Sequence, residues 1–144
     1  MAETKMIIGG EEEPAAFWKE HFYPHITDRN NGMIINVDIV EAALIKLAEN
    51  SMLAMKVTFA NELRALSNNL GVDYSAVAGG LALDSRLGKT HWQVPGPDGQ
   101  YGFGGKCLPK DSRALATAGR VRGMPFSGLE AAIEKNSKIR IFVD

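Results

Sequence analysis

One stretch of the chain places a nucleophilic side chain where its chemistry would be favoured. Cys107, the only cysteine among the 144 residues, stands between a run of glycines at residues 102–105 and a helix expected to start near Pro109. Free backbone N–H groups and the positive end of the helix dipole would favour the thiolate form, and Lys106 and Lys110 add positive charge. The pattern indicates a nucleophile.

Two other interpretations of this thiol stay open. A lone cysteine is commonly a small buried hydrophobe. The thiol could also serve a thiol enzyme in which His91, from the same glycine-rich region, is its partner. A P-loop would need glycine in place of Gln100, and a dinucleotide motif would need glycine in place of Cys107, so neither motif matches. The glycines would still let the backbone approach a phosphorylated or sugar ligand closely.

A second set of polar groups lies on a long helix expected to begin after Asp38. Lys46 and Asn50 are four residues apart and hence on one face, and Asn61 lies within about 60° of that face. Buried amine and amide groups that face a thiol would suit the stabilisation of an oxyanion. The alternative is that Lys46 extends to water and Asn50 meets a backbone group.

The elements that must position these groups are mainly helical. Asp38 and Glu41 form a capping-box pattern, and no Pro or Gly follows until Gly71, which predicts one long helix. This helix is apolar almost all round from residue 44 to 60, which favours dimerisation through it. Met6-Ile7-Ile8 predicts a short orphan strand at the N-terminus.

Shorter elements surround the long helix in the predicted fold. Helices are expected over residues 11–23, 73–81, 110–122 and 129–141, with a glycine-rich loop from 84 to 107. The predicted fold class is therefore mainly α, a long central helix with shorter packed helices and a Gly-rich loop.

Bulk properties narrow the classes of function. A chain of 144 residues has room for one compact domain, and 45% apolar with 23% charged residues is typical of a folded soluble protein. The net charge of −1 gives no general attraction to nucleic acid, and no apolar stretch is free enough of charge to span a membrane. A single cysteine favours a reducing, cytoplasmic setting. His21 and His25 have the spacing of a metal pair, but Pro24 separates them and no metal is expected.

Several stretches together resemble the UDP-glucose/GDP-mannose dehydrogenase family, in particular its UDP-glucose 6-dehydrogenases. They occur in the family's order and spacing over residues 46–54, 59–62, 71–73, 84–88 and 102–111. The resemblance covers nearly the whole chain, although family members are much longer. It implies the end of an NAD-binding domain and a linker over 1–36, a helical dimerisation domain with the catalytic cysteine over 37–128, and a helix toward a further C-terminal domain over 129–144.

The resemblance also implies a role for each candidate residue. Cys107 corresponds to the nucleophile that captures the C6 aldehyde of a UDP-hexose, with UDP-glucose favoured, as a thiohemiacetal; a thioester follows, which water hydrolyses to the uronate. NAD accepts both hydrides. Lys46 corresponds to the amine that steadies the oxyanion, and Asn50 and Asp111 to groups that position or activate water. Counterparts of substrate contacts are Arg86, which in some members reaches a neighbouring subunit's site, Phe103, Gly104, Gly105 and Lys110.

The chain departs from the family pattern in ways that bear on activity. Leu108 stands where many members have Phe, and Lys106 where a small residue is common. The dinucleotide fingerprint and the family's upstream acidic residue are absent. We therefore expect NAD to serve the complete enzyme, no cofactor to bind this chain alone, and this chain alone to be inactive.

Two hypotheses of function follow. The first is the nucleophile-bearing part of an NAD-dependent nucleotide-sugar dehydrogenase, a homodimer that binds a UDP-sugar and works with a separate NAD-binding domain. The second is a non-catalytic dimerisation or nucleotide-sugar-binding module, either a truncated remnant or a complement to a separate NAD domain.

Overall fold

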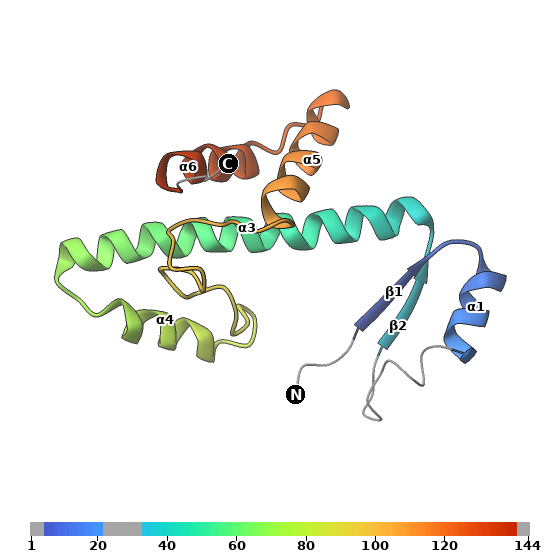
Figure 1. Ribbon diagram of the computed structural model, residues 1–144, viewed down its shortest axis with the longest axis horizontal. Helices are drawn as coiled ribbons and strands as arrows, with labels where there is room; N and C mark the ends of the chain where they lie inside the picture. Colours follow the sequence, from blue (N-terminus) through green and yellow to red (C-terminus); the bar gives the residue numbers. More distant parts are fainter. Residues whose placement is uncertain (1–4, 22–32, 141–144) are drawn as a thin grey trace. The chain divides into compact units, whose positions relative to one another are not determined.

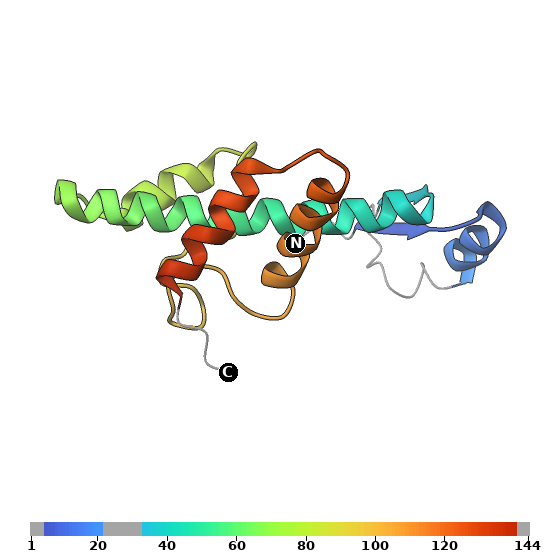
Figure 2. The same cartoon turned by 90° about the horizontal axis from the view of Figure 1, so that it is seen from above.

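The computed structural model describes residues 5–21 and 33–140, which belong to two compact units, residues 1–46 and 47–144 (Figures 1 and 2). The first unit contains β1 (Lys5–Gly9), α1 (Glu12–His21), β2 (Met33–Val37) and the start of α3 (Ile39–Leu70). The second contains the rest of α3, α4 (Tyr74–Leu83), α5 (Leu108–Val121) and α6 (Ser127–Ile139). The prediction of a mainly helical fold with a long central helix is confirmed.

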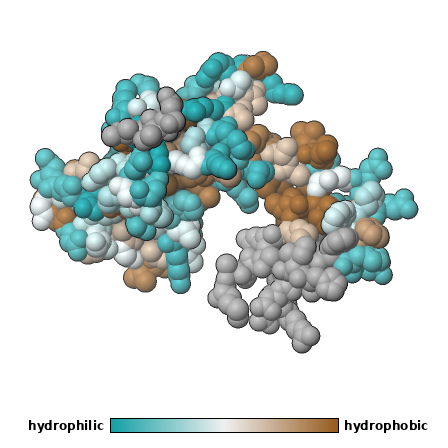
Figure 3. All heavy atoms as spheres, in the orientation of Figure 1, coloured by the Kyte–Doolittle hydropathy of each residue, from teal (hydrophilic) through white to brown (hydrophobic). Residues whose placement is uncertain are grey.

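The N-terminal strand is not the orphan that the sequence predicted. β1 pairs with β2 in parallel, and Ile7 lies opposite Ile35. Parallel strands need a crossover connection, and α1 lies in it, so the partner strand is far along the chain and a search of nearby residues misses it. Figure 3 shows apolar surface, drawn brown, gathered over β1, β2 and the first turns of α3, where Ile39 is 72% exposed.

The long helix begins and ends where its capping residues predict. Asp38 Oδ1 accepts from the backbone N–H groups of Val40 and Glu41 at 2.7 and 2.8 Å, and Glu41 Oε2 accepts from the N–H of Asp38 at 3.0 Å. This reciprocal pair satisfies N–H groups that have no partner within the helix. Gly71 follows the last turn with φ of 69°, a left-handed conformation that glycine adopts without strain.

The other helices agree with the predicted ones to within a few residues. Asp73 caps α4 by accepting from the N–H of Ser75 at 2.8 Å. α5 starts one residue before Pro109, and α6 starts two residues before the predicted Leu129. The described part of α1 ends at His21, and the predicted end of this helix at residue 23 lies outside the described residues.

Two buried clusters hold the second unit together. One joins α3, α4 and the loop that follows α4, through Ala60, Tyr74, Trp92 and Val94. The other joins α5 and α6 to α3, through Leu115, Ala116 and Leu129 with Leu47, Met55 and Ile133 packed against them. The loop between α4 and α5 is therefore packed against helices along its first half.

Side chains from α3 and α4 also hold that loop by its backbone. Lys56 Nζ donates to the carbonyls of Leu87 and Gly88 at 2.7 and 3.3 Å and lies 4.3 Å from the centre of the Trp92 ring. Tyr74 Oη donates to the carbonyl of Trp92 at 2.6 Å, and Arg64 donates to the carbonyl of Val94 at 2.8 Å. These bonds give the loop a defined path before it reaches the glycines.

Candidate functional site

The thiol of Cys107 lies at the N-terminus of α5, as the sequence predicted. Cys107 is the N-cap residue, its side chain caps none of the helix N–H groups, and it is exposed. The interpretation as a buried hydrophobe is therefore wrong. Since the first N–H groups of a helix carry its positive end, a negative charge that develops beside this position would be stabilised, and the exposed sulfur is accessible to a ligand.

Two of the predicted catalytic residues meet beside this turn. Asn50 Nδ2 of α3 donates to Asp111 Oδ2 of α5 at 2.5 Å, across 61 positions of sequence, and Asp111 is only 3% exposed. Asp111 also forms an ion pair with Lys110. The hydrogen bond that Lys110 donates to Asp111 raises the pKa of Lys110, desolvation lowers it by less, and the negative charge of Asp111 adds to the rise. The carboxylate thus links the thiol-bearing turn to the long helix.

Removal of the Asp111 charge should loosen this link. Asp111→Asn keeps the shape but turns one accepting oxygen into a donor, so the Asn50 bond is weakened at a buried position, and we expect a loss of about 1–3 kcal/mol in the free energy of unfolding. Urea denaturation measures it. Asp84→Asn, at a carboxylate that is 32% exposed, is the matched control and should shift the midpoint less; equal shifts would contradict a structural role for the Asp111 link.

A cavity of about 480 Å³ opens in front of the same turn. Three predicted substrate contacts, Phe103, Gly104 and Gly105, line it, together with Leu108 at the start of α5. Its other lining residues come from α3, the preceding loop and the end of α6, and they are Val57, Thr90, His91, Gln93, Gly96, Pro97, Asp98, Gly102 and Arg140. The cavity is mainly apolar with a few polar groups, the usual make-up of a small-molecule site.

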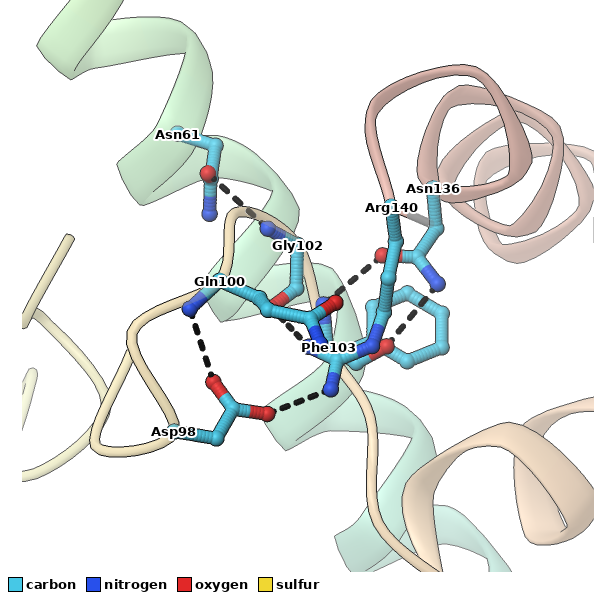
Figure 4. A network of polar contacts seen from close by, with 7 residues as sticks. All are labelled: Asn61, Asp98, Gln100, Gly102, Phe103, Asn136 and Arg140. Carbon is cyan, nitrogen blue, oxygen red and sulfur yellow. Dashed lines mark hydrogen bonds and ion pairs between the residues drawn. The ribbon is translucent and has the colours of Figure 1, made fainter. Parts of the chain in front are cut away.

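The segment of residues 96–106, here called the glycine loop, is held by side chains from two helices (Figure 4). Asn61 of α3 accepts from the N–H of Gly102 at 3.0 Å. Asn136 of α6 accepts from the N–H of Phe103 at 2.7 Å and donates to its carbonyl at 2.9 Å. Arg140, which follows α6, donates to the carbonyl of Gly102 at 3.3 Å and pairs with Asp98.

His91 is the cavity residue with the most unusual backbone. Its φ is 68°, a value that non-glycine residues seldom adopt, and its Nδ1 lies 2.8 Å from Thr90 Oγ1. Burial lowers the pKa of the imidazole, and the nearby Lys56 charge lowers it further, so the ring is mainly neutral at pH 7. Among the described residues, no hydrogen bond joins His91 to Cys107, so the geometry offers nothing to the thiol–histidine interpretation.

Arg86 is not joined to this cluster, and Lys46 belongs to the other compact unit. Arg86 is exposed and forms a bidentate pair with Asp84, with Nε and Nη2 at 2.9 and 2.6 Å from the carboxylate oxygens. This pairing lowers the pKa of Asp84. Lys46 is exposed and precedes Asn50 by one turn of α3, and because it belongs to the first unit, its approach to Cys107 stays a prediction.

The sequence reasoning missed Asn136, Arg140 and Asp98. A signal for Asn136 was present, since it falls on the apolar face of α6 in line with Leu129 and Ile133, and a polar residue there must find a partner. Asn61 was assigned to a polar stripe, but its role in the structure is to hold the Gly102 backbone.

Neither a metal site nor a membrane-spanning helix is present in the part of the chain that the structure describes. There, no three His, Cys, Asp or Glu side chains gather as metal ligands, and no helix has the length and apolar content to cross a bilayer. The ring of His21 faces the carbonyl of Phe17 at 3.0 Å, while His25 lies outside the described residues.

Comparisons with known proteins agree on one family. Residues 40–138 match the family model described as "UDP-glucose/GDP-mannose dehydrogenase family, central domain". The UDP-glucose 6-dehydrogenase TuaD of Bacillus subtilis is 38% identical over 99% of this chain and 29% of its own length. The UDP-glucose 6-dehydrogenase AglM of Haloferax volcanii is 32% identical over 94% of this chain and 31% of its length. The structure of a UDP-glucose dehydrogenase from Pyrobaculum islandicum aligns with a TM-score of 0.78 at 31% identity, covering 93% of this chain and 29% of that one.

The fold and these relatives define a helical domain of an oxidoreductase family. The chain belongs to the UDP-glucose/GDP-mannose dehydrogenase family and contains its central domain. It spans about three tenths of the length of the curated relatives that it matches.

Proposed function

We propose that this chain supplies the nucleophile-bearing part of a nucleotide-sugar dehydrogenase that oxidises the C6 alcohol of a UDP-hexose, most simply UDP-glucose, to the uronate. The observation that carries the proposal is the exposed Cys107 at the N-terminus of α5, one turn from the Asn50–Asp111 pair and next to a cavity lined by Phe103 and the glycines. The family match over residues 40–138 supports it.

In this proposal, Cys107 forms the bond to the substrate. Its sulfur adds to the C6 carbonyl carbon of the aldehyde, the C=O becomes a C–O⁻ group, and a proton completes the thiohemiacetal. Lys46 would steady the negative oxygen before that proton arrives. Oxidation of the C6 alcohol to the aldehyde, and of this adduct to a thioester, would each release a hydride to NAD held by a separate domain. Water then attacks the acyl carbon of the thioester and the C–S bond breaks, which returns the thiolate.

The Asn50–Asp111 pair would serve that last step. The carboxylate accepts from the Asn50 amide and from Lys110, and this fixes its orientation. A fixed carboxylate near the sulfur could orient the attacking water and take one of its protons. Lys110 and the exposed Arg86 would meet the negative charge of the diphosphate group of the substrate, Arg86 within its own or a neighbouring subunit's site.

The cavity suits a sugar. Phe103 offers an apolar ring, Thr90 and Gln93 offer hydrogen-bonding groups, and Gly105 has no neighbouring atom within 4 Å of where a side chain would start. A hexose presents apolar C–H faces and hydroxyl groups, and both kinds of group find partners here. We assign this cavity to the hexose of the substrate.

The described residues do not fit NAD, the cofactor that the family implies. A strand leads into a helix at two places among the described residues. Glu11, Glu12 and Glu13 follow β1, Asp38 and Glu41 follow β2, and these carboxylates would repel a pyrophosphate. Gly9, the last residue of β1, lies close to α3, since a Cβ added at Gly9 would lie 2.5 Å from Ala42 Cβ. The hydride acceptor would therefore have to be held by residues other than these.

A homodimer through α3 is part of the proposal. Met52, Phe59 and Leu66 recur every seven residues along one face of the helix, with Leu70 in line, and each is more than half exposed. An apolar stripe of this length on a helix is typical of an interface. A second copy of the chain would bury it.

The direct test of the proposed function is turnover in a reconstituted mixture. The chain is combined with the NAD-binding domain of TuaD, and NAD reduction is followed at 340 nm with UDP-glucose. We expect activity in the mixture and none from the chain alone. If the mixture reduces no NAD while the chain still binds UDP-glucose in calorimetry, the non-catalytic binding module replaces the enzyme hypothesis.

A further inference from the structure

The part of the glycine loop next to Cys107 is not stabilised by backbone hydrogen bonds within the loop. Its internal backbone bonds lie at its start, where Gly96 donates to the carbonyl of Gln100 at 2.8 Å and Gly99 donates to that of Gly96 at 2.9 Å. Beyond them, Gly102 and Phe103 are buried, so their backbone groups need partners. A glycine-rich segment also loses much conformational entropy on ordering. The order of this segment must come from elsewhere.

α6 and the residue after it, Arg140, provide most of the contacts that order the loop. The side chain of Asn136 is 2% exposed, and its amide uses both its donor and its acceptor on the backbone of Phe103. The side chain of Arg140 is 9% exposed and contacts the loop at two points, Asp98 and the carbonyl of Gly102. Figure 4 shows both side chains pointing from the end of α6 into the loop.

Gly102 and Gly104 leave the space that these two side chains occupy. A Cβ added at Gly102 would lie 2.3 Å from Asn136 Oδ1, and one added at Gly104 would lie 2.0 Å from Arg140 Nη2. The backbone of the loop therefore comes close to α6 as well as to the cavity. The sequence reasoning assigned these glycines to a ligand, and the structure gives Gly102 and Gly104 a second reason to lack side chains.

Along the chain, Cys107 lies between two residues that are hydrogen-bonded to helices. Phe103, held by Asn136, precedes Cys107 by four residues, and Asp111, held by Asn50, follows it by four. Arg140 also lines the cavity itself. A shift of the loop on α6 would thus move both the sulfur and the cavity wall.

We propose that Asn136 and Arg140 are positioning residues, which set the glycine loop so that the thiol and the cavity face one ligand. The role of the thiol rests on the proposed function, whereas the attachment of the loop can be measured without it. α6 bears none of the predicted catalytic or substrate-binding residues, but in this proposal it determines the geometry of the site.

The attachment is tested on the chain alone with Asn136→Leu and Arg140→Met. Each removes the bonds to the loop, and a lost buried hydrogen bond should speed amide hydrogen exchange in the peptide 101–107 about tenfold. Alkylation of Cys107 by iodoacetamide should slow about threefold as the sulfur loses its place at the helix dipole. Asn69→Leu, at an exposed site on α3, is the matched control and should change neither rate.

A structural role alone predicts a different pattern. Exchange would then rise equally in α3 and α4, and that result, or unchanged exchange in 101–107 for both variants, overturns the proposal. Arg140→Lys, which keeps the charge for Asp98, should restore part of the protection lost in Arg140→Met. Measuring two positions keeps the test decisive if one variant fails to fold.

The effect on the site is tested in the reconstituted mixture. There kcat/KM for UDP-glucose should fall at least about tenfold in both variants, since small misplacements of reacting groups are costly, while KM for NAD stays unchanged. A loosened loop with unchanged kcat/KM and unchanged alkylation would overturn the proposal. A wild-type mixture without turnover would count against the proposed function, and the exchange and alkylation measurements would still decide whether α6 positions the loop.

Discussion

The mixture reconstituted with Cys107→Ala is expected to form uronate at least about 10³-fold more slowly than the wild-type mixture, since loss of an enzyme's nucleophile costs this much or more. In the proposed mechanism the aldehyde is held as a covalent adduct before it is oxidised again, and this variant cannot form that adduct. Uronate release, followed by chromatography, measures the effect.

The chain allows a clean control for this variant. Cys107 is its only cysteine, so one equivalent of iodoacetamide should abolish the activity of the wild type and leave Cys107→Ala unmodified in mass spectrometry. Thr117→Ala, at an exposed position on the same helix, should keep wild-type turnover. Uronate formation at the wild-type rate by Cys107→Ala would remove the thiol from the mechanism.

The elements that the sequence predicted well are those set by neighbouring residues. Asp38 with Glu41, Asp73 and Gly71 each act within a few positions of a helix end, so their chemistry can be recognised without knowledge of the fold. The density of glycine and proline after α4 likewise marks a loop wherever it lies in space. Prediction of the helices was accurate for this reason.

Contacts that join distant segments could not be predicted from the residues alone. Nothing near β1 indicates β2 as its parallel partner, and nothing near Phe103 indicates Asn136, which is 33 residues away. The pairing of Asn50 with Asp111 was foreseen in part, and only because a family resemblance assigned both residues to one site. Bonds of this kind depend on how the helices pack, which residue spacing does not encode.

α3 carries a row of large apolar side chains that are more than half exposed within the chain. The two faces of α3 differ: Ala54, Ala60 and Ser67 are buried within the second unit, whereas Met52 and Leu66 remain 64% and 51% exposed. A stable monomer seldom leaves a continuous row of large apolar side chains in water. In a two-fold dimer each of these residues would be buried twice, once in each copy.

Met52→Glu and Leu66→Glu are therefore expected to raise the dissociation constant of the proposed dimer at least about 10²-fold each, because burial of such a side chain contributes about 1.5–3 kcal/mol per copy. Sedimentation equilibrium over a range of concentrations measures the constant. Both residues are more than half exposed within the chain, so the helical circular dichroism and the thermal midpoint should change little. Thr117→Asp, which adds one negative charge on the exposed face of α5 between Arg113 and Arg120, controls for charge alone and should leave the dimer intact. A wild-type chain that stays monomeric at high concentration, or variants that dimerise as tightly as the wild type, would show that this face of α3 is covered by something other than a second copy.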